Sequence, residues 1–253
     1  MDLYKPPADF VPLRTGDGSF TLRSDGIGEQ YHSQHGAVQE STHVYIKAGL
    51  EFLDKTEVDV LEVGLGTGLN LLLTWIRCLE GKCRVRYTAL EPFPLRRDQL
   101  EALGHCADLA WPGLHDAFIE RMTSGDEDWH AEVGGLAFRK LVRSAQEHDA
   151  HEAYDVIYYD AFAPEVQPEM WTLEMFQRMH AALRPGGVLV MYCAKGAVRR
   201  AMIAAGFEAR RHKGPPGKAH MLRAIKRWGL SKGMHGSVPH RDGGEQGLID
   251  GCL

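Results

Sequence analysis

The chain has 253 residues and a net charge of −5, which suits one α/β domain with additions and a large core. Its five cysteines form no CxxC pair and no metal-binding spacing with histidine, which argues against a disulfide-stapled secreted fold and favours a cytoplasmic protein without a bound metal. We expect no signal peptide and no membrane partner, because the longest apolar run, residues 69–75, is too short to span a membrane.

Residues 1–53 are expected to form an N-terminal extension. Residues 11–24 contain two short alternating runs around a glycine-containing turn, which predicts a β-hairpin. Residues 37–53 carry apolar side chains at helical spacing. We interpret this extension as a lid over a ligand, with Tyr31 and Glu40 as candidate contacts.

Residues 58–70 combine a buried strand, a glycine-rich turn and the start of a helix. The strand is rich in β-branched residues, as are core strands of parallel sheets. Glycine lets the turn adopt positive φ and lets a ligand approach its N–H groups. A helix is predicted over residues 69–79, with Thr67 as its cap. The turn has the pattern E-x-G-x-G-x-G, formed by Glu62, Gly64, Gly66 and Gly68.

The charge around this turn indicates its ligand. Phosphate-binding turns carry a lysine or open as G-x-G-x-x-G onto a helix, whereas here no lysine follows and Glu62 comes before the turn. An acid there repels a pyrophosphate and can pair with an ammonium, which suits S-adenosylmethionine. The next strand, residues 85–91, ends in Glu91, where an acid usually holds ribose hydroxyls. Because NAD sites share that acid, Glu91 alone does not discriminate, and a tight turn is the alternative for the glycines alone.

The middle of the chain is less regular. A short helix is predicted over residues 94–103, then an insertion over about 104–135, and a third strand over 135–142. Nucleotide methyltransferases often place an acid after this strand to hold the adenine amine. Arg, Ser and Ala stand here at 143–145, so the sequence leaves the adenine-binding residue open.

The predicted strand 154–159 ends in the sequence Asp-Ala-Phe-Ala-Pro. Its first residue, Asp160, is a carboxylate at the carboxyl edge of the sheet, the edge that the glycine turn also faces. The spacing resembles the D/N-P-P-F/Y signature of methyltransferases that act on amines, in which the polar side chain and loop carbonyls orient the amine. Because a helix is predicted over 168–183, Asp160 as a plain helix cap is the alternative.

The last part of the domain is predicted to close the sheet. A turn at 183–187 precedes a strand over 187–193, a basic helix follows over 196–205, and a strand pair, 207–212 and 219–226, flanks the sequence KGPPGK. Antiparallel closing strands of this kind fit the methyltransferase variant of the doubly wound fold. We expect domains over 1–53 and 54–228 and a mobile tail over 229–253.

Residues 195–227 hold ten basic residues and one acid, in a chain that is acidic as a whole. Such a segment indicates a polyanion partner, and a solvated surface is the alternative. The candidate RNA-binding residues are Lys195, Arg199, Arg200, Arg211, Lys213 and Lys218.

Several stretches carry a resemblance to a known family. They include HVYIKAGLEFL, LEVGLGTGLNLLLTW, ALEPFPL, YDVIYYDAFAP, the run from QPEMW to MIAAGF, and KGPPGKAHMLRA, which together cover about 30–228 with gaps. The sequence resembles the tRNA 5-methylaminomethyl-2-thiouridine methyltransferase (MnmD) family. Where the family usually has a basic-acidic pair before the final Met, this chain has Ala219 and His220.

The resemblance implies a class I S-adenosylmethionine-dependent methyltransferase with a Rossmann-like, doubly wound sheet of seven strands. It also implies S-adenosylmethionine as methyl donor and the wobble uridine in a tRNA anticodon loop as acceptor. Bifunctional members carry a flavin-dependent oxidase domain, which we expect to be absent here, so that other enzymes supply the aminomethyl-uridine.

The site residues follow from these motifs. Asp160 and Phe162 are the candidate catalytic residues, with Asp160 orienting the amine and accepting its proton, while Phe162 and Trp171 pack around the base. The candidate cofactor-binding residues are Tyr31, Glu62, Gly64, Gly66, Thr67, Gly68, Asn70, Glu91, Pro92 and Asp160. Two alternatives are open: a small-molecule amine methyltransferase or aminopropyltransferase of the same fold, and an RNA-binding protein with an inactive methyltransferase domain.

Overall fold

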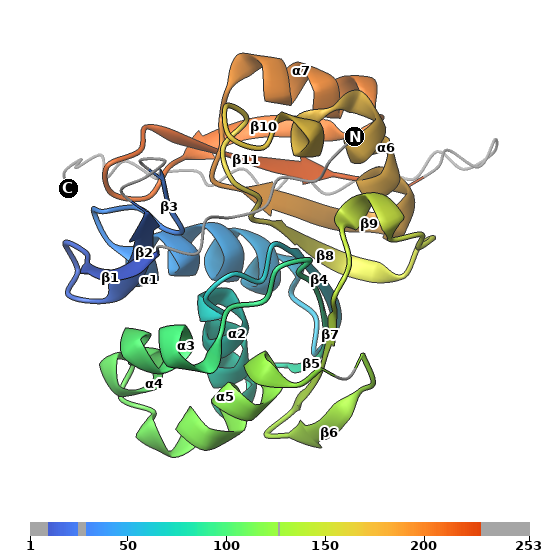
Figure 1. Cartoon of the computed structure of the whole chain (residues 1–253). Coiled ribbons are helices and arrows are strands. Elements are labelled where there is room, and N and C mark those ends of the chain that lie inside the picture. The colour runs from blue at the N-terminus through green and yellow to red at the C-terminus, as the bar shows by residue number, and fades with distance from the viewer. Residues whose placement is uncertain (1–9, 25–28, 126, 229–253) are drawn as a thin grey trace, which may run out of the picture.

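The computed structural model describes residues 10–24, 29–125 and 127–228. The tail over 229–253, for which the sequence predicts mobility, lies outside these residues. The centre of the molecule is an eight-stranded sheet with the order β10-β11-β9-β8-β4-β5-β7-β6 (Figure 1). Its strands are β4 (Glu57–Val63), β5 (Arg84–Leu90), β6 (His130–Val133), β7 (Leu136–Leu141), β8 (Tyr154–Tyr159), β9 (Leu183–Met191), β10 (Glu208–Lys213) and β11 (His220–Ile225).

The five inner strands β9, β8, β4, β5 and β7 are parallel. From β4 the chain builds outward through β5 and β7, and it then returns to build β8 and β9 on the other side of β4. This reversal of strand order places a crevice at the carboxyl ends of β4 and β8, the usual ligand position in open α/β sheets. The antiparallel strands β11 and β10 close one edge, as the sequence predicts.

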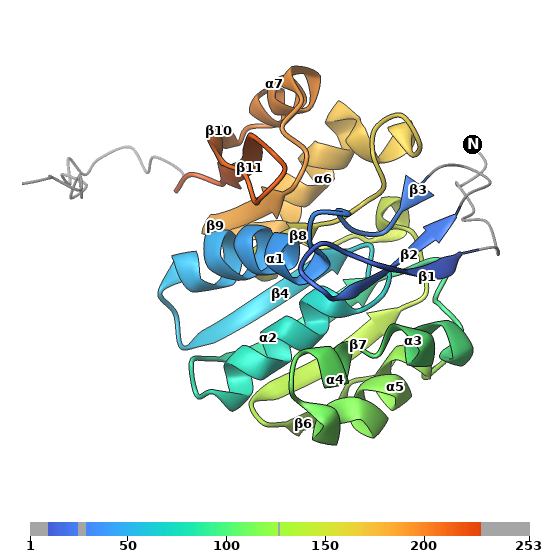
Figure 2. The same cartoon turned by 90° about the vertical axis from the view of Figure 1, so that its left-hand side faces the viewer.

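Helices cover both faces of the sheet (Figures 1 and 2). One face carries α1 (Ala37–Ser41), the π-helical η1 (Thr42–Leu50), α2 (Leu69–Leu79) and α5 (His115–Thr123), which enclose a core containing the fully buried Trp75, Tyr87 and Tyr158. The other face carries α6 (Leu173–Ala182) and α7 (Gly196–Ala204), packed over a second core. The shorter helices are η2 (Glu51–Leu53), α3 (Arg97–Leu103), α4 (His105–Asp108), η3 (Pro112–Leu114), η4 (Ala145–Glu147) and η5 (Pro168–Trp171).

A small N-terminal sheet lies beside α3 (Figure 2). It consists of β1 (Val11–Arg14), β2 (Phe20–Ser24) and β3 (Glu29–Gln30) in antiparallel pairs, so the predicted hairpin is confirmed. Phe10, Leu22 and Leu103 pack together with the partly buried Tyr31 and Phe162. The chain that follows β3 is thereby held next to the carboxyl edge of the main sheet.

Two of the predicted elements differ from the structure in detail. The sheet has one strand more than the predicted seven, because β6, within the predicted insertion, pairs antiparallel with β7. The turn predicted at 183–187 is an irregularity inside β9, since Tyr154 pairs with Leu183 whereas Val156 pairs with Val188.

The predicted helix 168–183 is also divided. It consists of η5 and α6, because Thr172 is extended and accepts a hydrogen bond from the Met175 N–H as the N-cap of α6.

The predicted cap of α2 is wrong. The helix begins and ends where the sequence predicts, but its N-cap is Gly68 in the left-handed conformation, with no side-chain cap hydrogen bond. Thr67 Oγ1 is buried and has no hydrogen-bond partner within the described residues.

No helix in the described part of the chain is long and apolar enough to cross a membrane. Over the same residues, no three His, Cys, Asp or Glu side chains are grouped so that they could hold a metal ion.

Candidate functional site

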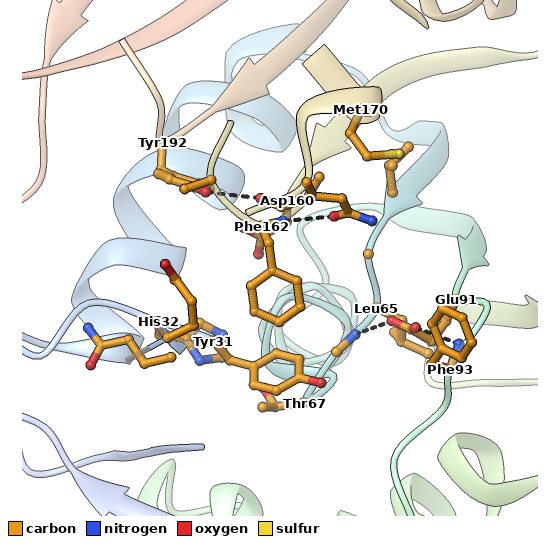
Figure 3. Close-up of a pocket in the computed structure, with 18 of the residues that line it drawn as sticks. Tyr31, His32, Leu65, Thr67, Glu91, Phe93, Asp160, Phe162, Met170 and Tyr192 are labelled. Atoms are coloured by element: carbon orange, nitrogen blue, oxygen red, sulfur yellow. Dashed lines mark hydrogen bonds between the residues drawn. The ribbon is translucent and has the colours of Figure 1, made fainter. Parts of the chain in front are cut away.

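A cavity of about 360 Å³ opens at the carboxyl ends of β4, β5, β7 and β8 (Figure 3). The segment after β3 and the loop between β10 and β11 complete its wall. Its volume is near the lower end of the range usual for small-molecule sites. It is lined by nine residues that the sequence analysis assigns to cofactor, catalysis or RNA: Tyr31, Gly64, Gly66, Thr67, Glu91, Pro92, Asp160, Phe162 and Lys218.

The glycine turn brings the β4 loop against the β8 loop. Gly64 has φ +88°, and a Cβ at this position would lie 2.7 Å from the backbone oxygen of Asp160. A larger residue would therefore be strained by its φ and would clash with backbone. Glycine here lets the turn and the Asp160 loop approach closely enough to form one cavity wall.

Glu91 fixes the same turn from β5. Its Oε2 accepts a hydrogen bond from the Gly66 N–H at 3.0 Å, and its Oε1 accepts one from the Phe93 N–H at 2.9 Å. The dashed lines beside Glu91 in Figure 3 mark these contacts. Burial raises the pKa of Glu91 above its ordinary value, although the two N–H groups favour the carboxylate. A carboxylate oxygen accepts more than one hydrogen bond, so Glu91 can also accept bonds from ligand hydroxyls.

Asp160 follows β8 and is held from two sides. Tyr45 on η1 donates its hydroxyl hydrogen to Oδ1 at 2.6 Å, and Asn70 on α2 donates from Nδ2 to Oδ2 at 2.9 Å. Burial raises the pKa of Asp160 to about 7, whereas these two hydrogen bonds lower it. A carboxyl group with a pKa near neutrality can exchange a proton at physiological pH, which is the property of a general base.

Glu62 does not line the cavity, contrary to the expectation that it meets the ligand. It is fully buried, with Oε1 bonded to Asn70 Nδ2 at 2.9 Å and Oε2 bonded to the Tyr87 hydroxyl at 2.8 Å. Burial raises the pKa of Glu62 well above its ordinary value. Gly68 and Asn70 are also absent from the cavity wall. The geometry gives Glu62 a positioning role, because it shares with Asp160 the amide group of Asn70.

Two aromatic side chains meet over the cavity. The rings of Tyr31 and Phe162 are 5.1 Å apart between centroids and meet edge to face at an interplanar angle of 61°, and Figure 3 shows both pointing into the same space. Trp171 lies behind this pair, since it is buried and donates its Nε1 hydrogen to the Phe162 carbonyl at 2.8 Å. The predicted packing of Trp171 around a base is therefore not supported, and Trp171 instead holds the loop that carries Phe162.

The residues that follow β7 form part of the cavity wall, in the region where the sequence left the adenine-binding residue open. Ser144, Ala145 and Gln146 line the cavity beside β5, on the side where Glu91 lies. Gln146 Oε1 has no hydrogen-bond partner within the described residues.

Two further side chains at the site, Tyr45 and Tyr192, are not among the residues predicted from the sequence. Tyr192 directly follows β9, and its strand-end position was the available signal.

Most of the predicted RNA-binding residues lie outside the cavity. Lys195, Arg200, Arg211 and Lys213 are exposed on or near α7 and β10. Lys195 pairs with Glu165, and Arg199 instead links α7 to β10 by donating to the Ala209 carbonyl at 3.0 Å. Lys218 is turned into the cavity. The six residues therefore do not form one uniform surface.

The cavity suits a ligand that carries cationic groups. Its wall includes the carboxyl side chains of Glu29, Glu40, Glu91 and Asp160 and one lysine, Lys218. The glycine turn also presents backbone without side chains. These features fit S-adenosylmethionine, which has an ammonium, a sulfonium and ribose hydroxyls.

Comparisons with known proteins agree with this geometry. A family model described as S-adenosyl-L-methionine-dependent methyltransferase matches residues 115–227. The tRNA 5-methylaminomethyl-2-thiouridine biosynthesis bifunctional protein MnmC of Aeromonas salmonicida is 31% identical over 222 residues, covering 79% of this chain and 33% of that protein. The MnmC protein of Cupriavidus metallidurans is also 31% identical, over 83% of this chain and 33% of its own length. The chain thus spans about a third of the length of these relatives.

Solved structures give the same result. MNMC2 from Aquifex aeolicus has a TM-score of 0.68 and 26% identity, covering 88% of this chain and 72% of that one. Spermidine synthase from Thermotoga maritima has a TM-score of 0.56 at 14% identity, covering 87% and 69%, which shows a shared fold alone. These matches confirm the resemblance and the class I methyltransferase fold indicated by the sequence, and over residues 115–227 the chain matches the S-adenosyl-L-methionine-dependent methyltransferase family.

Proposed function

We propose that this methyltransferase methylates the primary amine of 5-aminomethyl-(2-thio)uridine at the wobble position of tRNA. The product is 5-methylaminomethyl-(2-thio)uridine. The observation that carries the proposal is the placement of Asp160, whose carboxyl group lines the cavity at the sheet edge that also carries the glycine turn and Glu91. The relatives named for the biosynthesis of this nucleoside in tRNA support the choice of acceptor.

S-adenosylmethionine, when bound, supplies an electrophilic methyl group on a positively charged sulfur. We assign its ribose to Glu91. Gly64 and Gly66 let the cofactor approach the backbone of the turn closely, and Thr67, Pro92 and Tyr31 are further contacts. Ser144 and Gln146 lie where the adenine would meet the end of β7. Asn70 and Glu62 support this wall from behind, since the Asn70 amide donates to both Glu62 and Asp160.

The acceptor amine must lose a proton before it can react. An alkylamine has a pKa near ~10.4, as lysine does, so its protonated form without a lone pair dominates at neutral pH. In our proposal Asp160 accepts one proton from the ammonium and leaves the nitrogen lone pair free. Phe162 and Tyr31 exclude water and hold the uracil ring, since their rings meet over the cavity. Alignment of this kind can supply roughly 7–11 kcal/mol of the acceleration.

The exposed basic residues favour RNA as the carrier of this amine. We expect the combined variant Lys195→Ala, Arg200→Ala and Lys213→Ala to weaken tRNA binding by about 10-fold or more, because each substitution removes a phosphate contact. The magnitude of the negative slope of log affinity against log salt should decrease by about 2, at about 0.7 for each contact with a single strand. Filter binding at several salt concentrations measures both quantities.

The matched control for this variant is Lys82→Ala, since Lys82 is exposed in the turn between α2 and β5 and is not a cavity residue. Its tRNA affinity should equal that of the unchanged protein. An unchanged salt slope in the triple variant would mean that these residues form a solvated surface only.

The direct test of the proposed reaction uses labelled S-adenosylmethionine and bulk tRNA from cells that lack this protein, followed by nucleoside analysis. We expect label in 5-methylaminomethyl-uridine nucleosides. Label in another nucleoside would contradict the proposed acceptor while leaving the methyltransferase assignment intact. The tRNA must come from cells with the upstream enzymes, because we propose that these supply the aminomethyl-uridine.

A small-molecule amine is the second candidate acceptor. The acid-lined cavity would also suit a polyamine, and the spermidine synthase fold is the same. Transfer of label to a small amine, with none to tRNA, would favour this alternative.

We further propose a cytoplasmic location, where tRNA is available. The division into an extension over 1–53 and a methyltransferase domain over 54–228 stays a prediction.

A further inference from the structure

One lysine in the cavity is neutralised by the protein itself. Lys218, in the loop between β10 and β11, donates from Nζ to Glu40 Oε1 at 2.8 Å. The same ammonium lies over the ring of Tyr192, 4.3 Å from its centroid. A carboxylate together with an aromatic face is the combination that proteins use to hold alkylammonium groups. Lys218 therefore sits in a site that has the chemistry of an amine receptor.

Glu40 has capacity beyond this ion pair. Its side chain is only 7% exposed, and Oε2 has no hydrogen-bond partner within the described residues. A buried carboxylate oxygen without a donor costs free energy, because it has lost its hydrogen bonds to water and has none from the protein to replace them. Since Glu40 lies on the cavity wall, a donor from an entering ligand can meet this deficit.

The site borders the candidate base. Glu40, Lys218, Tyr192 and Asp160 all line one cavity, and Tyr192 donates its hydroxyl hydrogen to the carbonyl of Ala161, next to Asp160. Glu40 raises the pKa of Asp160 and Lys218 lowers it, both after the larger effect of burial, so the three charges lie within electrostatic reach of one another.

We propose that Glu40 and the ring of Tyr192 form the receptor for the acceptor's ammonium group, and that the Lys218 ammonium occupies this receptor until the acceptor enters. This inference rests on the proposed function, since it names how the same cavity receives a primary alkylammonium. When the acceptor ammonium takes the place of Lys218, the lysine is released toward the RNA backbone. The acceptor then lies beside Asp160, which removes its proton.

The proposal predicts opposite effects of two near-isosteric substitutions on binding of a minimal acceptor. The probe is the nucleoside 5-aminomethyluridine, titrated by calorimetry into the full chain saturated with S-adenosylhomocysteine, so that no reaction occurs. Lys218→Met should bind the nucleoside about 10-fold more tightly than the unchanged protein, because the competing cation is gone. Glu40→Gln should bind it about 10-fold more weakly or worse, because the receptor carboxylate is gone.

Lys218→Met should also bind tRNA more weakly than the unchanged protein, since the released lysine can no longer meet a phosphate. This reversal between nucleoside and tRNA is not expected of a merely structural lysine. Lys47→Met is the matched control, because Lys47 is exposed on η1 and does not line the cavity. It should leave nucleoside affinity unchanged, and equal affinity of all variants for S-adenosylhomocysteine establishes that each is folded.

Two outcomes would overturn the proposal. One is a Lys218→Met protein that shows no gain in nucleoside affinity, including the case in which neither protein binds the nucleoside measurably. The other is a Glu40→Gln protein that binds the nucleoside as tightly as the unchanged protein. A failure of the proposed function appears separately, as absence of methyl transfer to tRNA by the unchanged protein.

Discussion

Replacement of Asp160 with alanine is expected to lower the rate of methyl transfer by about 10²–10⁴-fold, the range usual for loss of a general base. The affinity for S-adenosylhomocysteine should stay within a few-fold, because Glu91 and the glycine turn remain in place. The carboxyl group is held by Tyr45 and Asn70 at the cavity wall, where an acceptor can reach it. Single-turnover transfer and calorimetric cofactor binding measure the two quantities independently.

The matched control is Asp149→Ala, since Asp149 is exposed in the loop before β8 and does not line the cavity. Its transfer rate should equal that of the unchanged protein. If cofactor affinity collapses in Asp160→Ala, then Asp160 belongs to the cofactor site and its assignment as base is wrong.

The pH dependence of transfer provides a second measure of the same residue. Asp160 must be ionised to accept a proton, so the rate should rise as pH increases through the pKa of about 7. The Tyr45 hydrogen bond lowers that pKa. In Tyr45→Phe the pKa of Asp160 should therefore rise, and the acidic limb of the rate profile should move to higher pH. A limb that stays in place would mean that a different group controls it.

The parts of the fold that the sequence predicts most closely are set by local pattern. The helix α2 spans Leu69–Leu79 and the strand β8 spans Tyr154–Tyr159, as the apolar runs and the glycine turn indicate. Parallel strands bury both faces, so such runs are easily recognised. Because carboxyl ends of parallel strands meet at one edge, strand-end positions also predict that Glu91 and Asp160 line a common cavity.

The contacts that complete the site depend on tertiary packing, which a local pattern does not contain. Tyr45 reaches Asp160 across 115 positions of sequence, and Lys218 reaches Glu40 across 178. Glu62 has the spacing of a ligand residue, yet its side chain lies on the side of β4 where Asn70 and Tyr87 satisfy it. Charge counting alone assigned Lys218 to RNA, whereas the loop between β10 and β11 carries it into the cavity.

Replacement of Glu91 should weaken cofactor binding strongly, and glutamine should be nearly as damaging as alanine. The two carboxylate oxygens accept hydrogen bonds from two different backbone N–H groups, those of Gly66 and Phe93. Glutamine has one oxygen, so its amide nitrogen would face the other N–H, donor against donor. Each bond to a charged group contributes about 1.5–3 kcal/mol, so we expect affinity for S-adenosylhomocysteine to fall by at least 10–100-fold.

Calorimetry with S-adenosylhomocysteine measures this loss directly, and a thermal unfolding scan of each ligand-free variant establishes whether the fold is retained. Glu101→Gln is the matched control, because Glu101 on α3 forms only an exposed ion pair with Arg97, which contributes little. Tight binding by Glu91→Gln but not by Glu91→Ala would show that one accepting oxygen is enough. The charge and the second oxygen of Glu91 would then be dispensable, and the turn geometry, rather than the carboxylate, would have to account for the affinity.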